Sequence, residues 1–545
     1  MGIPTLYTRE LYESYTRQGY WTEQTIADLW DINGQRFPDR EAVVDSGTRL
    51  TWSEGVTWIN RMALGLLELG LKKDELVILQ LPNSVELVLL RVACEKAGLL
   101  GLPALRTFRH TEMEHIIEHS RAAAVVVLPE FRGFNYREMY RDIQPKFPFL
   151  KHIIYAGVNP PADSLSIKNM VGSPLESKYP GDYLASKKTP WNEFSLVLHT
   201  SGTTGLPRLS EYPVCSNVYL GRATAERLGL TPDDIVFTIS PAGLGPSMPC
   251  HLAAPVAGSK IVMQEHFTAG EALKVIEKEK VTVLGAVPAQ LAMLSAVLAV
   301  KKYDTSSLKV IRVTGSPLAY HVGKEAEERL GAPIIQSYGS VDFSGVGSGL
   351  PQESMDARLL TAGYPNPGNE IKLVDEAGNE VPEGEVGEIL GRGPTAVSGY
   401  YRDKEDTGKT WENGWCHMGD LGKFDSAGRL MIVGRKKEMI IRGGQNIYPA
   451  EIEALLVTHP SISAAAVVPY PDAVMGEKAC AFVALEPRRN ITFEEMVAFL
   501  KEKDIAPFKI PERLEIISAL PMVADGQKVD KKLLAQHLAG KLKAS

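Results

Sequence analysis

The chain has 545 residues, more than one hydrophobic core usually serves, so at least two domains are expected. Charged residues make up 23% and hydrophobic residues 44% of the chain, which argues against a disordered or fibrous protein. The net charge is −7, and no long basic run and no stretch of 18 apolar residues occurs, so neither nucleic acid nor a membrane is an expected partner.

The cysteines indicate a reducing compartment. Their number is odd and none shows CxxC spacing, so neither a disulfide framework nor a zinc site is expected. The N-terminal residues MGIPTLYTRELY are polar and contain no apolar signal core, and Gly2 lacks a myristoylation context. We therefore expect a cytoplasmic protein, and a homodimer is compatible with the sequence. The cysteines are Cys94, Cys215, Cys250, Cys416 and Cys480.

Helical and β-rich patterns alternate over the first half of the chain. Residues 58–69 and 85–97 have helical patterns, whereas 76–80 and 123–127 are short β-rich runs. This alternation predicts an α/β architecture with largely parallel sheets.

The sequence pattern changes after about residue 369. Glycine-broken short strands up to residue 434 predict a small β-barrel subdomain, and about a hundred residues with their own helices and strands follow. We expect a large N-terminal domain of two α/β subdomains plus the barrel at 1–434, a hinge at 435–437 and a small mobile α+β domain at 438–545.

The segment LVLHTSGTTGLPR at 196–208 is a candidate phosphate loop. Its glycines let backbone N–H groups approach phosphate oxygens, its hydroxyls add donors and Arg208 adds a cation. It lacks the GxxxxGK[ST] pattern of a Walker loop, and a plain turn is the alternative. The candidate residues are Thr200, Ser201, Gly202, Thr203, Thr204, Gly205 and Arg208.

This loop resembles that of the adenylate-forming superfamily, which includes acyl-CoA synthetases, luciferases and peptide-synthetase adenylation domains. Further blocks typical of this superfamily follow in order, and the early stretches FPDREAVVDSGTRLTWSE and LPNSVELVLLRVACEKAG are also typical of it. The resemblance therefore spans nearly the whole chain.

The block QSYGSVD at 336–342 resembles the YGxTE motif of that superfamily. The resemblance implies that Tyr338 stacks on adenine and that Asp342 serves Mg²⁺. Val341 stands where threonine is usual, and Asp342 is one methylene shorter than the usual glutamate. The neighbouring nucleotide contacts are Ser337, Gly339 and Ser340.

Other blocks supply further nucleotide contacts by resemblance. VIRVTGSPL at 310–318 resembles the strand and turn that hold adenine and shape the acyl pocket, and an ordinary turn is the alternative. WENGWCHMGDLG at 411–422 resembles the block whose aspartate binds ribose, a task that suits the two oxygens of Asp420. His417 is not expected to be catalytic. The turn residues are Gly315, Ser316 and Pro317.

GRKKEMIIRGGQNIYPAEIE at 434–453 resembles the hinge and first C-terminal segment of the superfamily. The resemblance implies that Arg435 reaches ribose or phosphate and that Lys437 is the pivot. Gly443 and Gly444 would line the passage of the CoA pantetheine arm.

ALPMVADGQKVDKKLL at 519–534 resembles the terminal block whose lysine bridges the acid and the α-phosphate. Gln527 separates Gly526 from Lys528, and an ungapped count would place Gln527 at the catalytic position. We prefer Lys528 because residues 529–532, VDKK, restore the usual sequence.

The resemblance implies an AMP-forming acid:CoA ligase with ATP, Mg²⁺ and CoA. The carboxylate attacks the α-phosphorus of ATP, pyrophosphate leaves, and a thiol then attacks the acyl-adenylate after the C-terminal domain rotates. An aryl-acid:AMP ligase of the 2,3-dihydroxybenzoate type, which loads a carrier protein, and a catalytically silent nucleotide-binding protein are the alternatives.

The acid is expected to be cyclic, either alicyclic such as cyclohexanecarboxylate or aromatic such as benzoate. Residues 101–127 resemble those of aryl-acid-activating members, and the small residues in SPAGLGPSMPC at 240–250 leave room for a ring. The alternative is that another segment fills this space. The expected acyl-pocket residues are Ala242, Gly243, Leu244, Gly245, Val341 and Gly345.

Overall fold

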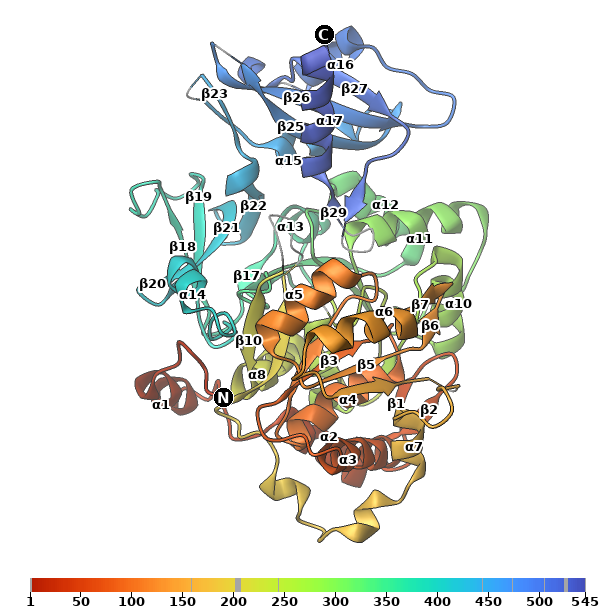
Figure 1. Cartoon of the computed structure of the whole chain (residues 1–545). Coiled ribbons are helices and arrows are strands. Elements are labelled where there is room, and N and C mark those ends of the chain that lie inside the picture. Colours follow the sequence, from red (N-terminus) through yellow and green to blue (C-terminus); the bar gives the residue numbers. More distant parts are fainter. Residues whose placement is uncertain are drawn as a thin grey trace.

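The computed structural model describes residues 2–157, 159–200, 207–243, 245–443, 445–472, 474–503, 505–523 and 528–544. The chain forms a large mixed α/β N-terminal domain and a smaller C-terminal domain, shown in blue in Figure 1. Within the described residues, no helix is both long and apolar enough to cross a bilayer. The expected fold class is confirmed.

The larger sheet carries the strands that lead to the segments where nucleotide contacts are expected. It is parallel from β1 to β15, and antiparallel strands flank both edges. In spatial order its strands are β17 (Tyr364–Pro365), β16 (Gly347–Ser348), β15 (Ile334–Tyr338), β14 (Val310–Val313), β13 (Val283–Ala286), β11 (Ile235–Thr238), β12 (Lys260–Val262), β1 (Glu41–Val44) and β2 (Arg49–Thr51).

The second sheet is parallel except at one edge, where β10 runs antiparallel to β9. Its strand β3 is buried along its whole length, as expected for a strand covered on both faces. In spatial order the strands are β10 (Leu209–Pro213), β9 (Phe194–His199), β4 (Leu100–Pro103), β3 (Leu76–Gln80), β5 (Ala124–Val127) and β8 (His152–Tyr155). A short hairpin pairs β6 (Glu130–Phe131) with β7 (Phe134–Asn135).

Helices cover these sheets, and local capping explains where one of them begins. The side chain of Thr51 accepts from the Glu54 N–H while Glu54 reaches back to the Thr51 N–H, so α3 begins before the helix expected at 58–69. The helices are α1 (Arg9–Arg17), α2 (Ile26–Arg36), α3 (Trp52–Glu68), α4 (Val85–Lys96), α5 (His110–Ser120), α6 (Tyr136–Ile143), α7 (Ile167–Gly172), α8 (Val214–Leu228), α9 (Met248–Ala257), α10 (Ala269–Glu279), α11 (Pro288–Val300), α12 (Tyr320–Leu330), α13 (Met355–Leu360) and α14 (Lys404–Thr410).

An antiparallel sheet follows in the region where a small β subdomain was expected. Its strands are β18 (Glu370–Val374), β19 (Gly387–Arg392), β20 (Trp411–Glu412), β21 (Trp415–Phe424) and β22 (Leu430–Arg435). In its register Asp420 of β21 lies opposite Arg435 of β22. This pairing brings two residues of different sequence blocks together.

The C-terminal domain has hydrophobic clusters of its own, formed by residues after 439. Its main sheet contains β23 (Ile440–Arg442), β24 (Gln445–Ile447), β25 (Ile462–Asp472), β26 (Gly476–Leu485) and β27 (Arg513–Ile517). Its helices are α15 (Pro449–Leu456), α16 (Phe493–Glu502) and α17 (Lys531–Ala544), and a hairpin pairs β28 (Met522–Val523) with β29 (Lys528–Val529).

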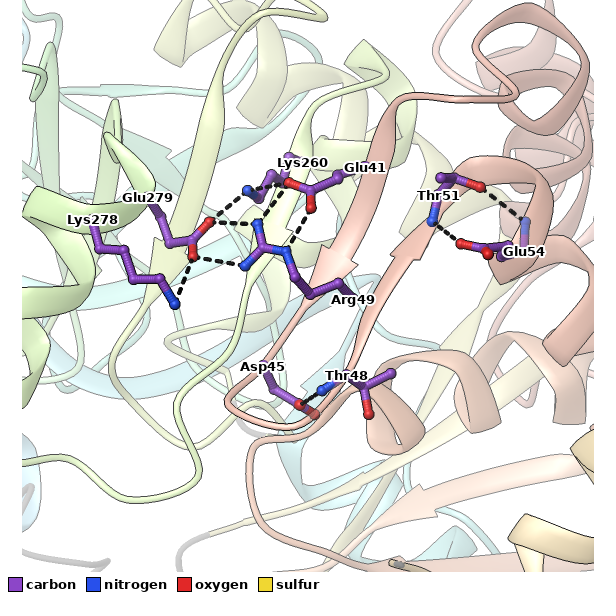
Figure 2. Close-up of polar contacts among 9 residues, drawn as sticks. All are labelled: Glu41, Asp45, Thr48, Arg49, Thr51, Glu54, Lys260, Lys278 and Glu279. Atoms are coloured by element: carbon purple, nitrogen blue, oxygen red, sulfur yellow. Dashed lines mark hydrogen bonds and ion pairs between the residues drawn. The ribbon is translucent and has the colours of Figure 1, made fainter.

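An ionic network ties the β1–β2 hairpin to the rest of the larger sheet (Figure 2). Arg49 contacts Glu41 at 2.6 Å and Glu279 at 2.8 Å, and Lys260 contacts the same two carboxylates at 2.6 Å each. The hydrogen bond from Arg49, with further support from Lys260, lowers the pKa of Glu279 to about 2. The network therefore holds β1, β2, β12 and α10 together.

The five cysteines are buried and free, so none takes part in a disulfide. Burial raises the pKa of the Cys94 and Cys480 thiols to about 12, which keeps them protonated and unreactive.

Candidate active site

Tyr338, Asp420 and Arg435 form a polar cluster at the carboxyl end of β15, in which Tyr338 and Asp420 are buried and Arg435 is about half exposed. The Tyr338 hydroxyl donates to Asp420 Oδ2 at 2.7 Å, and Arg435 Nε lies 3.0 Å from Asp420 Oδ1. Only 8% of Tyr338 and 5% of Asp420 are exposed. Burial raises the pKa of Asp420, whereas the positive charge of Arg435 opposes this shift. The cluster presents an aromatic face and a carboxylate side by side.

Lys528 of the C-terminal domain reaches the same cluster. It lies on β29, at the edge of its domain that faces the N-terminal domain (Figure 1), and pairs in register with Val523. Burial and the charge of Arg435 lower the pKa of Lys528, while the carboxylates of Asp420 and Glu438 oppose this shift. The other candidate for the terminal role, Gln527, lies outside the described residues.

Asp342 lies in a second polar group that contains Arg208, and both side chains are partly exposed. Arg208 NH2 lies 3.7 Å from Asp342 Oδ2, and the Ser210 hydroxyl donates to Asp342 Oδ1 at 3.2 Å. The Arg208 guanidinium also lies 4.4 Å from the ring centroid of Tyr400. Burial raises the pKa of Asp342, and Arg208 lowers it.

Arg208 is also hydrogen-bonded to the residue at the other end of the candidate phosphate loop. The Thr200 N–H donates to the Arg208 carbonyl at 2.8 Å, and the Arg208 N–H donates to Thr200 Oγ1 at 3.1 Å. These bonds continue the β9–β10 ladder and hold the loop ends together. The loop residues Ser201, Gly202, Thr203, Thr204 and Gly205 lie outside the described residues.

The residues near Asp342 fit a magnesium ion that arrives with a nucleotide. Mg²⁺ is usually held by one or two carboxylates together with substrate phosphates and water, rather than by an all-protein cage. Asp342 supplies one carboxylate, and the described part of the chain contains no cluster of three or more His, Cys, Asp or Glu residues that could hold a metal without a nucleotide. The donor set thus suits a nucleotide-bound cation.

The turn after β14 has a conformation that favours glycine. Gly315 has φ +94°, and a Cβ there would lie 3.2 Å from Val287 Cγ1 and 3.4 Å from Pro246 Cγ. Ser316 and Pro317 follow on the same turn before α12. The turn therefore lies against the segment that contains Pro246.

The residues after β15 form a tight turn. A Cβ on Gly339 would lie 2.8 Å from the backbone N of Gly345. The Ser340 hydroxyl accepts from the backbone N–H of Asp342 at 3.0 Å, and the Val341 carbonyl accepts from the Tyr212 hydroxyl at 2.8 Å. These contacts fix the backbone that carries Asp342.

The small residues at 240–250 do not share one role. A Cβ on Gly243 would lie 2.4 Å from Pro103 Cβ, so the expected space for a ring at Gly243 is filled by Pro103. Among the described residues, no heavy atom lies within 4 Å of a Cβ position on Gly245. Ala242 is buried, and its N–H donates to Asn83 at 2.7 Å. Leu244 lies outside the described residues, so Gly245 is the position here that leaves space for a ligand.

A cavity of about 300 Å³ opens between the N-terminal sheets. Its wall includes Val287, which contacts the Gly315 turn, and its lining also includes Arg106, Glu265 and His266. Arg132 donates to the His266 ring at 2.8 Å. The cavity therefore combines a wall next to the Gly315 turn with a guanidinium, a carboxylate and an imidazole ring.

Lys436 of the expected hinge contacts the N-terminal domain, and Glu438, just after it, contacts α17 of the C-terminal domain. Lys436 donates to Glu388 of β19 at 2.6 Å, Lys437 is exposed, and Lys531 of α17 donates to Glu438 at 2.7 Å. Gly443 has φ +55° and is exposed directly after β23, and Figure 1 shows β23 well apart from β29. The structure thus brings Lys528, but not Gly443, to the Tyr338–Asp420–Arg435 cluster. Gly444 lies outside the described residues.

Several residues of the site escaped the sequence analysis. Ser210, Tyr212 and Tyr400 surround the Asp342 turn, and Glu388 holds Lys436. They come from strands and connections outside the recognised blocks, so no local pattern marks them. His417 lies 3.4 Å from Glu388 and 3.8 Å from Glu412, away from the Tyr338 cluster.

An aromatic ring and a carboxylate on one domain and a lysine on the other define a two-domain nucleotide-binding enzyme. Comparisons with known proteins agree. The family model of the AMP-binding enzyme matches residues 30–401, and that of the AMP-binding enzyme C-terminal domain matches residues 451–527.

Individual relatives match along almost the whole chain. The medium-chain fatty-acid–CoA ligase of Escherichia coli (strain K12) is 31% identical over 550 residues, covering 99% of this chain and 95% of the relative. The 2,3-dihydroxybenzoate-AMP ligase of Bacillus subtilis (strain 168) is 29% identical, with coverage of 98% and 97%. The crystal structure of an anthranilate CoA ligase in complex with anthranoyl-AMP aligns with a TM-score of 0.86 at 25% identity, covering 96% and 98% of the two chains.

The chain belongs to the AMP-binding enzyme family. It is an ATP-using, adenylate-forming acid ligase, and its relatives include both CoA ligases and aryl-acid:AMP ligases.

Proposed function

We propose that this enzyme is an AMP-forming acid:CoA ligase that acts on a cyclic carboxylic acid. The observation that carries the proposal is the convergence of Lys528 from the C-terminal domain on the Tyr338–Asp420–Arg435 cluster. A lysine beside a ribose-binding carboxylate can neutralise the charge that develops when a carboxylate attacks the α-phosphorus.

In the first half-reaction the protein holds two anions, the acid carboxylate and the α-phosphate of ATP, next to each other. Tyr338 stacks on adenine, Asp420 accepts from the ribose hydroxyls, and Lys528 holds the acid carboxylate against the α-phosphate. Arg208 and the loop at 200–205 hold the departing phosphates. When bound at Asp342 with ATP, Mg²⁺ would neutralise phosphate charge.

In the second half-reaction a thiol attacks the adenylate carbonyl and AMP leaves. The cavity of about 300 Å³ suits a pantetheine arm because its wall at Val287 contacts the Gly315 turn. Arg106 in its lining, and Arg132, which donates to His266 of the lining, are cations that suit the phosphates of CoA, and they outnumber the one carboxylate of the lining, Glu265. This assigns Ala242 and Gly243 to the thiol passage and leaves Gly245 beside the acid. A Cβ on Gly345 would lie 2.3 Å from Leu220 Cδ1, so Leu220 fills the space that was expected for the acid at Gly345.

The two half-reactions need different contacts at one centre. We therefore assign residues 1–434 to the ATP- and acid-binding domain, 435–437 to the hinge and 438–545 to a mobile domain. Rotation about Lys437 would withdraw Lys528 and bring Gly443 and Gly444 to the thiol.

The second candidate function is carrier-protein loading by an aryl-acid:AMP ligase. The similarity to the 2,3-dihydroxybenzoate-AMP ligase favours it. The two functions differ in the thiol, because a carrier protein presents pantetheine without the phosphoadenosine of CoA.

An acid panel tests the proposal. AMP release is measured with acetate, octanoate, benzoate, 2,3-dihydroxybenzoate and cyclohexanecarboxylate, each with and without CoA, and compared by kcat/KM. We expect CoA-dependent release with a ring acid. A preference for acetate or octanoate would contradict the cyclic acid, and dihydroxybenzoyl-AMP that CoA fails to discharge would support carrier loading.

A further inference from the structure

A polar recess lies beneath the strand that carries Tyr338. Its polar lining comes from α8, β14, β15, β16 and the segment after β17, and none of its lining residues is acidic. Its volume is about 10 Å³, enough for about one water-sized group. The polar lining side chains are Thr224, Arg227, Arg312, Ser337, Ser348 and Asn366.

Arg312 is a buried cation with neutral partners. Only 5% of it is exposed, and its NH1 group donates to the Pro246 carbonyl at 2.9 Å. The Cys250 thiol is its other hydrogen-bond partner, and no ion pair between described residues includes Arg312. Burying a charge without an opposite charge is costly, so this guanidinium is suited to an anion that arrives with a ligand.

The recess adjoins the place that the proposed function gives to the acid. Arg312 pairs in register with Ile335, and its acceptor residue Pro246 lies against Gly315. Ser337 directly precedes Tyr338, and Gly345 also lines the recess. Arg312 therefore lies behind the Pro246–Gly315 contact, next to the place that the proposed function gives to the acid.

We propose that the acid activated by this enzyme carries a second carboxylate, which Arg312 and Ser337 bind in this recess. The inference rests on the proposed function and narrows its acid to a dicarboxylate. A guanidinium presents paired donors that match carboxylate geometry. The Ser337 hydroxyl lies 2.7 Å from the Ser348 hydroxyl, and it can donate to the carboxylate when Ser348 donates to it. The recess has room for one oxygen of the carboxylate and none for a ring.

Arg91 offers a matched control. Its NH1 group donates to the Ala242 carbonyl at 3.1 Å and contacts Met248 Sδ at 3.2 Å, so it holds the same 240–250 segment as Arg312. No ion pair within the described part of the chain includes Arg91. It does not line the recess. A purely structural role of Arg312 would therefore be shared by Arg91.

The experiment compares matched acids in a pyrophosphate-release assay with hydroxylamine trapping. The pairs are benzoate with benzene-1,3-dicarboxylate and cyclohexanecarboxylate with cyclohexane-1,3-dicarboxylate; acetate and octanoate are included. We expect kcat/KM for the dicarboxylate of at least one pair to exceed that of its partner by about tenfold or more. Arg312→Met should remove this preference, whereas Arg91→Met should change the ratio by less than about twofold.

Each other outcome overturns the inference. Wild-type enzyme that uses the monocarboxylates as well as the dicarboxylates, or only acetate or octanoate, contradicts it and leaves the ligase intact. Parallel losses on both acids in Arg312→Met and Arg91→Met would show that Arg312 only supports the 240–250 segment. Pyrophosphate release with none of these acids would overturn the proposed cyclic-acid function, and the inference with it.

Discussion

Replacing Asp420 by alanine should weaken ATP binding strongly. Asp420 is 5% exposed and is held by Tyr338 at 2.7 Å and Arg435 at 3.0 Å, so its carboxylate is oriented before ATP arrives. Two charge-assisted bonds to the ribose hydroxyls are each worth about 1.5–3 kcal/mol. Their loss should cost about 3–6 kcal/mol, or roughly a hundredfold to ten-thousandfold in ATP affinity.

The assay is ATP binding by calorimetry, with thermal unfolding measured in parallel. Asp420→Ala also leaves the buried Tyr338 hydroxyl without its partner, which should lower the free energy of unfolding by about 1–3 kcal/mol. Tyr338→Phe is the matched control, because it removes the same hydrogen bond but keeps the ring and the carboxylate. Its ATP affinity should fall by about tenfold or less. An Asp420→Ala protein that binds ATP as well as Tyr338→Phe would refute the ribose role.

Lys528→Ala should slow adenylation by about 100- to 1000-fold and spare thioester formation from preformed acyl-AMP. Gln527→Ala should spare both half-reactions, and the reverse pattern would assign the catalytic role to Gln527. Lys437→Pro should keep acid-dependent pyrophosphate exchange and lose acyl-CoA formation, because proline fixes φ at the pivot; survival of both half-reactions would place the hinge elsewhere. Arg106→Ala should raise the KM for CoA and leave pyrophosphate exchange unchanged, and an unchanged KM would contradict the CoA assignment of the cavity. The pKa of Glu279 in the folded protein is about 2, below its ordinary value of 4.5, so the ionised carboxylate stabilises the fold by about 3 kcal/mol at most. This stabilisation is present above pH 4.5 and is lost as the pH falls toward 2. Glu279→Gln (Figure 2) should therefore be less stable than wild type at pH 7, with a difference that shrinks on acidification, and a pH-independent difference would contradict the assignment.

The layers of the fold were predictable because they depend on local patterns. Buried parallel strands are continuous apolar runs, and the strand expected at 76–80 is β3 with the same bounds. The helix expected at 85–97 is α4, which ends at Lys96. The start of α3 was missed because it depends on a reciprocal bond between Thr51 and Glu54 rather than on apolar periodicity.

The nucleotide cluster was recognisable, but its surroundings were not. Tyr338, Asp420 and Arg435 lie in recognised blocks, so their identities could be read before their contacts were known. Gly243 was misread because its missing side chain accommodates Pro103, a residue 140 positions earlier in the chain. The neutral surroundings of Arg312 likewise depend on which strands and helices meet, and no single segment encodes them.

Isotope transfer tests the central claim most directly, namely that the acid is activated as an acyl-adenylate. The best acid of the panel, labelled with ¹⁸O in its carboxylate, is incubated with the enzyme, ATP and CoA, and the products are analysed by mass spectrometry. Attack of the carboxylate on the α-phosphorus, followed by thiol attack at the carbonyl carbon, leaves one carboxylate oxygen on AMP. The account predicts AMP that carries one ¹⁸O and unlabelled pyrophosphate, whereas ADP with labelled phosphate, or unlabelled AMP, would contradict it.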